Sequence, residues 1–150
     1  MLSIGRLCSI FTLAMLLCFV LGCDDNGGQG TVEPLSNEPI VVESVLCLDV
    51  NDARPVGITD AFFESDDKIY LWIYWSNVDL SSEVEVFWYE PGAESAAQHD
   101  SQSIDSLSGY AITWFSIDRP VGNFEVGEWS VDIYIDGLFE RSHLFSVLRD

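Results

Sequence analysis

Basic side chains are scarce in this sequence. Its 150 residues include 6 Lys and Arg against 25 Asp and Glu, which gives a formal charge of −19. A surface of that charge repels nucleic acids and anionic lipid headgroups, so binding to DNA or RNA is excluded. The same charge keeps the protein soluble through self-repulsion, and it attracts cations and basic partners.

The residues most used in catalysis and zinc binding are also few. Of the 2 His in the chain, His99 falls in a polar stretch and His143 in an expected hairpin, and their spacing to the 4 Cys does not suit zinc. The sequence contains no Gly-x-Ser-x-Gly elbow, phosphate loop or dinucleotide fingerprint. A pair of catalytic carboxylates cannot be recognised by sequence among so many acids. We therefore expect a protein that is not an enzyme and has no cofactor, calcium being the one alternative.

The N-terminal segment has the layout of a secretory signal. Arg6 is its single charged side chain, and an almost uncharged run follows from Leu7 to Leu21. This run of about fifteen residues is shorter than the roughly twenty that a membrane-spanning helix needs. A removable, helical signal peptide over residues 1–22 is therefore expected rather than a retained transmembrane anchor.

The end of this signal has a specific pattern, formed by Val20, Leu21, Gly22 and Cys23. It resembles the lipobox of bacterial lipoproteins. The resemblance implies cleavage after Gly22 and a thioether-linked diacylglycerol on Cys23. Each buried methylene contributes about 0.8 kcal/mol to membrane binding, so several acyl chains hold firmly. We expect an extracytoplasmic, lipid-anchored protein, with the inner membrane, the outer membrane and the cell surface left open.

Cysteine usage in the mature chain follows from this cleavage. Cys8 and Cys18 leave with the signal and Cys23 carries lipid, so Cys47 alone remains. A single cysteine forms no internal disulfide, and the domain must be held together by its core. Cys47 stands between two leucines, which favours an inert, buried thiol.

The mature chain divides into a tether and a domain. Residues 23–39 begin with the lipidated cysteine and continue in Asp, Asn, Gly, Gln, Glu and Pro without apolar periodicity. This composition is typical of a flexible tether, with a reach of roughly 20 to 25 Å. Residues 40–150, about 110 in number, suit one domain with one core.

This domain is predicted to be an all-β, immunoglobulin-like antiparallel β-sandwich of about 6–8 strands, with a small barrel as the alternative. No helical stripe follows the signal, and short alternating segments are separated by turns. Strands are expected at residues 40–50, 68–77, 83–89 and 110–117, and in a terminal hairpin over 129–148.

Three of these segments carry further detail. Both faces of Lys68–Asn77 are apolar or aromatic, which predicts a central strand covered on both sides or one with a face open to a ligand. Asp136 and Gly137 favour a type I′ turn, because both central residues need positive φ. Pro91–Ser108 is long and polar, so it is expected to be a loop with at most a short strand near Ser103.

A second resemblance extends over most of residues 43–148. The residues that carry it are Cys47–Gly57, Tyr70–Trp75, and a Gly127, Trp129, Val131–Gly137, Phe145, Val147 pattern. They are similar to an uncharacterised family of immunoglobulin-like domains in bacterial envelope proteins. This resemblance implies the sandwich fold and no particular function.

Aromatic side chains are the first candidate for binding. A flat row of exposed rings on a sheet stacks against sugar rings, whereas buried rings fill the core between two sheets. We expect most of the set to lie in the core and Tyr70, Trp72 and Tyr74 to be the exceptions, forming a possible glycan-binding face. The full set is Tyr70, Trp72, Tyr74, Trp75, Trp88, Tyr89, Trp114 and Trp129.

Calcium is the second candidate. Asp49, Asn51 and Asp52 match the short Asp-x-Asn-Asp motif of cadherins, whose oxygens bind a hard cation. The companion acidic segments of cadherin sites are missing, and Asn and Asp after a strand also form ordinary turns. The sequence thus favours a lipid-anchored envelope module with an unidentified protein partner, and a glycan-binding module or a calcium-dependent adhesin as alternatives.

Overall fold

The computed structural model describes residues 38–78 and 81–150 of the chain. The predicted signal peptide, its lipobox at Val20–Cys23 and most of the tether lie outside these residues. Within them no helix is long and apolar enough to cross a membrane. The strands of the described part are β1 (Ile40–Asn51), β2 (Arg54–Ile58), β3 (Ala61–Phe63), β4 (Lys68–Val78), β5 (Ser82–Tyr89), β6 (Gln98–Ile104), β7 (Gly109–Asp118), β8 (Gly127–Ile135) and β9 (Leu138–Leu148).

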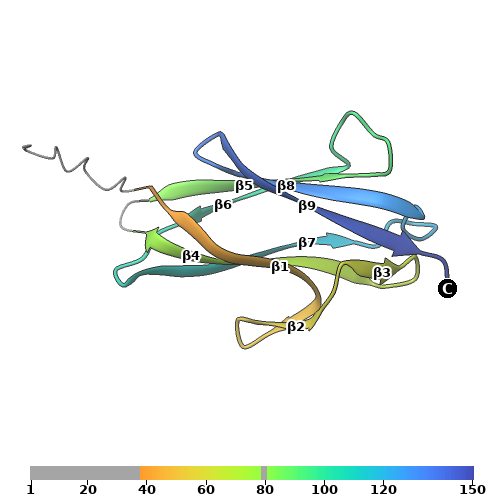
Figure 1. The fold of residues 1–150 in the computed structure, drawn as a ribbon, viewed down its shortest axis with the longest axis horizontal. Helices are drawn as coiled ribbons and strands as arrows, with labels where there is room; N and C mark the ends of the chain where they lie inside the picture. The colour runs from red at the N-terminus through yellow and green to blue at the C-terminus, as the bar shows by residue number, and fades with distance from the viewer. Residues whose placement is uncertain (1–37, 79–80) are drawn as a thin grey trace, which may run out of the picture. The chain divides into compact units, whose positions relative to one another are not determined.

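These strands form two sheets that pack face to face (Figure 1). One sheet has four strands in the order β2-β1-β4-β7, and the other has five in the order β3-β9-β8-β5-β6. All neighbours are antiparallel except β3 and β9, which run parallel. The domain is an all-β, immunoglobulin-like sandwich, as the alternating sequence predicts.

The core forms because one parity of each central strand is apolar and faces the opposite sheet. The fully buried side chains include Trp75 of β4, Trp88 of β5 and Trp129 of β8. Trp75 Nε1 donates to Thr113 Oγ1 at 2.9 Å, and Trp129 Nε1 donates to the Glu125 carbonyl at 2.7 Å. Two of the three indoles thus keep a hydrogen bond inside the core.

Phe145 of β9 lies at the centre of the aromatic packing. Its ring centroid is 5.6 Å from that of Phe62, 6.2 Å from that of Trp88 and 6.0 Å from that of Trp129. The first two contacts are edge-to-face and the third is stacked, both of which are favourable ring geometries. Because these rings come from β3, β5, β8 and β9, Phe145 links four strands of the sandwich.

Several predicted elements are confirmed. β4 is a central strand between β1 and β7. The terminal hairpin is β8–β9, and its turn residues Asp136 and Gly137 have φ of 49° and 77°, as a type I′ turn requires. Cys47 is buried as expected, and burial raises the pKa of its thiol.

Within residues 91–108, where a loop with at most a short strand near Ser103 was expected, Gln98–Ile104 forms β6, a strand of 7 residues. This strand pairs with β5 at the edge of the five-stranded sheet, and only Ile104 is buried. A polar strand is held there by backbone hydrogen bonds, so it has no apolar alternation to reveal it. Two short strands, β2 and β3, were likewise not expected from the sequence.

Truncating Phe145 should cost much more stability than truncating an exposed phenylalanine. We expect Phe145→Ala to lower the free energy of unfolding by about 3–5 kcal/mol, because it leaves a cavity among three rings. Phe139→Ala, at a ring that is 59% exposed, is the matched control and should have little effect. Urea unfolding followed by tryptophan fluorescence measures both, and equal losses would contradict the central role of Phe145.

Candidate binding face on the four-stranded sheet

The outward side chains of β4 and β7 form a continuous aromatic surface. Since Leu71, Ile73 and Trp75 fill the core, the other parity of β4 must point away from it. The same holds for β7, whose register places Trp114 beside Trp72 and Tyr110 beside Ser76. We call this surface the aromatic face; it consists of Tyr70, Trp72, Tyr74, Tyr110, Ile112 and Trp114.

Three rings of the aromatic face lie in one stacked row. The centroids of Trp72 and Tyr74 are 6.4 Å apart with an angle of 25° between the ring planes. Those of Tyr74 and Tyr110 are 6.0 Å apart with an angle of 16°. The rings therefore hold one another in nearly parallel orientations before any ligand arrives.

Exposure differs along the face and corrects two sequence expectations. Trp72, expected to be exposed, is only 7% exposed, because its Nε1 donates to the Ala53 carbonyl at 2.8 Å under the β1–β2 turn. Tyr70 and Tyr74 are half-buried. Trp114, expected in the core, is 46% exposed, and Tyr110, which the sequence reasoning missed, is 56% exposed.

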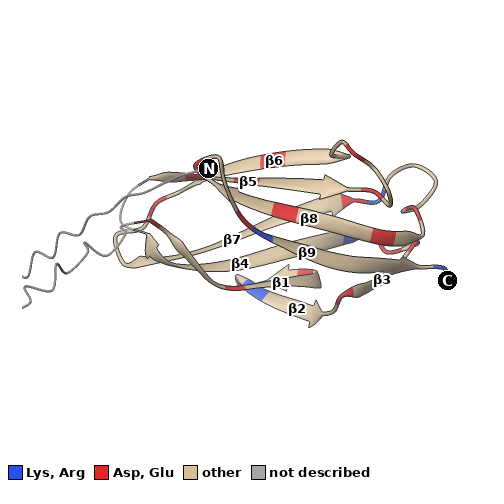
Figure 2. Cartoon of the chain, turned by 45° about the horizontal axis from the view of Figure 1, so that its top comes forward, with Lys and Arg blue, Asp and Glu red and all other residues tan. Residues whose placement is uncertain are grey.

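A basic side chain lies at one end of the aromatic face. Lys68 Nζ is 5.7 Å from the centroid of the Tyr70 ring and 2.8 Å from Asp118 Oδ1. The hydrogen bond with Asp118 raises the pKa of the Lys68 amine, so the cation over the ring is stabilised. By contrast, acidic positions mark β6 and β8 on the other sheet (Figure 2).

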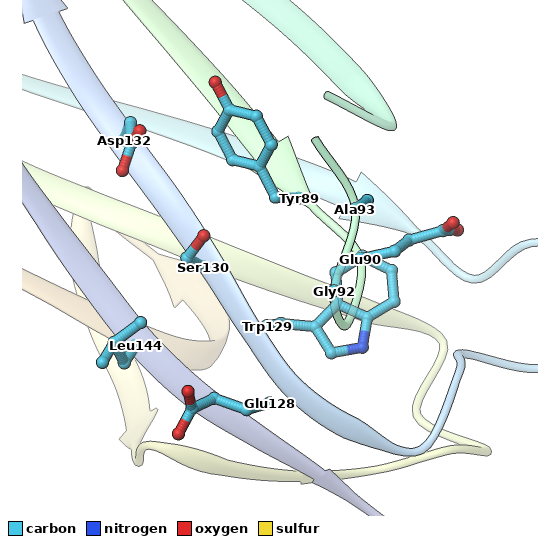
Figure 3. A pocket seen from close by; sticks show the side chains of 9 residues that line it. All are labelled: Tyr89, Glu90, Gly92, Ala93, Glu128, Trp129, Ser130, Asp132 and Leu144. Atoms are coloured by element: carbon cyan, nitrogen blue, oxygen red, sulfur yellow. The ribbon is translucent and has the colours of Figure 1, made fainter. Parts of the chain in front are cut away.

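A shallow pocket of about 300 Å³ lies on that other sheet (Figure 3). Tyr89 of β5 and Ser130 and Asp132 of β8 line it, together with Glu128 and the loop after β5. Burial, followed by the charge of Asp132, raises the pKa of the Tyr89 hydroxyl. Three carboxylates, those of Glu90, Glu128 and Asp132, line the pocket. The pocket therefore offers hydrogen bonding and negative charge.

The calcium motif forms a turn. Asp52 and Ala53 have φ of 50° and 58° and lie between the paired residues Asn51 and Arg54. This is the geometry of a type I′ hairpin turn. Asp49 Oδ1 accepts a hydrogen bond from the Val50 N–H at 2.8 Å. In the described ranges, no group of three His, Cys, Asp or Glu is arranged to hold a metal ion.

The two histidines have different surroundings. His99 lies in β6 rather than in a loop; its ring stacks on Phe87 at 4.2 Å, and its Nε2 is 3.1 Å from Glu85 Oε1. His143 Nε2 is 2.7 Å from Ser44 Oγ of β1, at the edge where β9 approaches the four-stranded sheet.

Ser44 and His143 border a cavity of about 340 Å³, and their contact has the length of a nucleophile–base pair. Arg141 Nη1 also donates to Ser44 Oγ at 3.3 Å, and Arg141 Nη2 donates to the Val41 carbonyl at 3.4 Å. In the part of the chain that the structure describes, His143 donates no hydrogen bond to a carboxylate that would orient its ring. The cluster joins β1 of the four-stranded sheet to β9 of the five-stranded sheet.

No protein-family model matches the chain, and no curated protein matches it significantly.

The burial of His143 beside Arg141 should make stability depend on pH. Burial, followed by the charge of Arg141, lowers the pKa of His143 below its ordinary value of 6.5. Below about pH 6.5 the unfolded chain therefore binds a proton that the folded chain resists, so stability falls as the pH drops toward the folded pKa. Urea unfolding at several values between about pH 5 and pH 7.5 measures this loss.

Two glutamine variants separate the histidines. His143→Gln should flatten the pH dependence of the free energy of unfolding in this window. His99→Gln removes the other imidazole of the chain and should leave the dependence in place. If His143→Gln keeps the full dependence, another group causes it.

Proposed function

We propose that the protein is a non-catalytic binding module, held to a membrane of the cell envelope by lipid on Cys23, and that the aromatic face is its binding surface. The observation that carries this proposal is the exposure of Tyr110 and Trp114, at 56% and 46%, beside the fixed rings of Trp72 and Tyr74. Large rings held on the outside of a sandwich have no task in its core, and an exposed apolar cluster of this kind is typical of interaction sites.

A glycan is the ligand that the aromatic face fits best. The apolar face of a sugar ring stacks on an aromatic ring, and rings that are already oriented lose little entropy on binding. Ser76 and Ser116 border the rings at neighbouring register positions and offer hydroxyl groups to the sugar. The strongly negative chain disfavours anionic polymers, so the proposed ligand is a neutral or cationic polysaccharide.

An envelope protein is the second candidate ligand for the same surface. Ile112, 39% exposed, lies between Tyr110 and Trp114 and adds aliphatic area that sugars do not need. The calcium-dependent adhesin has weaker support, because Asn51 and Asp52 form part of the β1–β2 turn and Asp49 accepts a hydrogen bond from the backbone just before it.

Removing exposed rings from the aromatic face should weaken glycan binding. We expect Tyr110→Ala and Trp114→Ala each to weaken it about tenfold, or about 1.4 kcal/mol, because each deletes a stacking platform. Calorimetric titration with soluble β-glucan, xylan and partly deacetylated chitin measures the effect. Phe139→Ala, at a similarly exposed ring on the other sheet, is the matched control. If none of these polysaccharides binds, or if both alanine variants bind as tightly as the wild-type protein, the glycan assignment is overturned.

The lipid anchor is tested separately. In the bacterial host, Cys23→Ser should abolish incorporation of labelled fatty acid and move the protein from the detergent phase to the aqueous phase, because no thioether can form. Cys18→Ser, a change inside the proposed signal, is the matched control and should keep label and anchoring. Labelled, membrane-bound Cys23→Ser protein would refute the anchor.

A further inference from the structure

The edge of the four-stranded sheet formed by β7 is unusually open. The other edge strands of the two sheets are short or polar: β2 has five residues and includes Pro55, β3 has three, and β6 carries Asp100 among mostly polar residues. β7 has ten residues, and its single charge, Asp118, is at its end. Proteins usually protect such an edge with charges, proline or a bulge, and β7 has none of these along Tyr110–Trp114.

The backbone groups on this edge can be assigned. The Arg119 N–H donates to the Asp67 carbonyl at 2.9 Å and continues the β4–β7 register, so the odd-numbered residues of β7 direct their backbone groups to β4 and Ser116 directs its groups away from it. The Ser116 carbonyl accepts a hydrogen bond from Gln98 Nε2 at 2.9 Å, which fits this orientation. Alternate residues of a strand direct their N–H and C=O groups to the same side, so Tyr110, Ile112 and Trp114 also face outward. Ser108 Oγ, which donates to the Tyr110 carbonyl at 3.4 Å, agrees with this assignment. In the described part of the chain, no strand pairs with this side of β7.

We propose that β7 pairs in antiparallel fashion with β7 of a second copy of the chain, about a two-fold axis at Ile112. The segment Tyr110–Trp114 is self-complementary in this register. Tyr110 lies opposite Trp114 of the second copy, Ile112 opposite its own counterpart, and Ala111 opposite Thr113. A two-fold interface requires such self-complementarity, and aromatic cross-strand pairs stabilise antiparallel sheets.

The lack of acidic side chains in Tyr110–Trp114 favours this segment for self-association. The sequence carries 25 acids, yet Tyr110–Trp114 has none, so the pairing places no like charges opposite one another. The rest of the surface still repels a second copy, so added salt should strengthen the dimer. The Gln98–Ser116 hydrogen bond confines the ladder to about five residues, and this small contact implies weak association in solution.

The pairing extends the four-stranded sheet to eight strands across two copies. It also joins the two aromatic faces into one surface, since Tyr110 and Trp114 belong both to that face and to the edge. Anchoring both copies in one membrane would raise their effective concentration, but the pairing itself does not depend on the lipid or on a glycan.

Disulfide trapping in the full-length protein tests both the contact and its register. The wild-type thiols of the processed protein do not interfere, because Cys8 and Cys18 leave with the proposed signal, the proposed lipid occupies Cys23 and Cys47 is buried. Ile112→Cys places two thiols opposite each other, about 5.5 Å apart at Cα, so air oxidation in membranes should yield a covalent dimer. Tyr110→Cys alone and Trp114→Cys alone should give no covalent dimer, because each cysteine would lie roughly 13 Å from the same cysteine of the second copy. The double variant Tyr110→Cys/Trp114→Cys should cross-link again.

A proline variant tests the backbone pairing. In the double-cysteine protein, Ile112→Pro removes an outward N–H, which an edge strand tolerates, and should lower the dimer yield at least about fivefold. Ile112→Ala keeps that N–H and is the matched control; near-UV circular dichroism checks that both variants are folded. No cross-linking at any position, equal cross-linking by Tyr110→Cys and Ile112→Cys, or indifference to proline would each overturn the β7 pairing. These outcomes test the pairing alone; glycan binding by the wild-type protein is measured by the calorimetric titration, so the two proposals can fail separately.

Discussion

Strand alternation around β4 is the constraint on which the rest of the structure depends. Both parities of this strand are apolar or aromatic, and only one of them can face the opposite sheet. The aliphatic parity, with Ile69, Leu71 and Ile73, enters the core, where the Phe145 cluster joins the strands without a disulfide. The aromatic parity is thereby forced outward. The candidate binding face is thus a consequence of how the core is packed.

The sequence alone was sufficient for the fold class, the central position of β4 and the terminal hairpin, because alternation and the Asp136–Gly137 pair are local signals. Only a short strand near Ser103 was expected in place of β6, because an edge strand with polar residues on both faces has no apolar period. Trp72 and Trp114 were assigned to the wrong environments for a different reason. Trp72 is covered by a turn that comes from β1 and β2, and such a contact between distant segments leaves no local trace.

Tyr110 could have been found, since a signal for it exists. Like β4, the segment 110–117 is apolar on both parities, with Ile112 and Trp114 on one and Phe115 and Ile117 on the other. When both sets of alternate side chains in a sandwich strand are apolar, one set must point away from the core. The Asp-x-Asn-Asp motif is a related case, because residues that tolerate positive φ make good turns and also resemble cation ligands. Ala53 lacks that tolerance, and the indole of Trp72 fixes its carbonyl in place.

The parallel pairing of β3 with β9 has a consequence for the order of folding. It joins Ala61–Phe63, near the beginning of the domain, to the last strand of the chain. Contacts between such distant segments form slowly, because a long loop must close first. The sandwich therefore cannot be completed while its C-terminal strand is still being synthesised. A domain that stays open until β9 has been made suits the passage across a membrane that the proposed signal peptide implies.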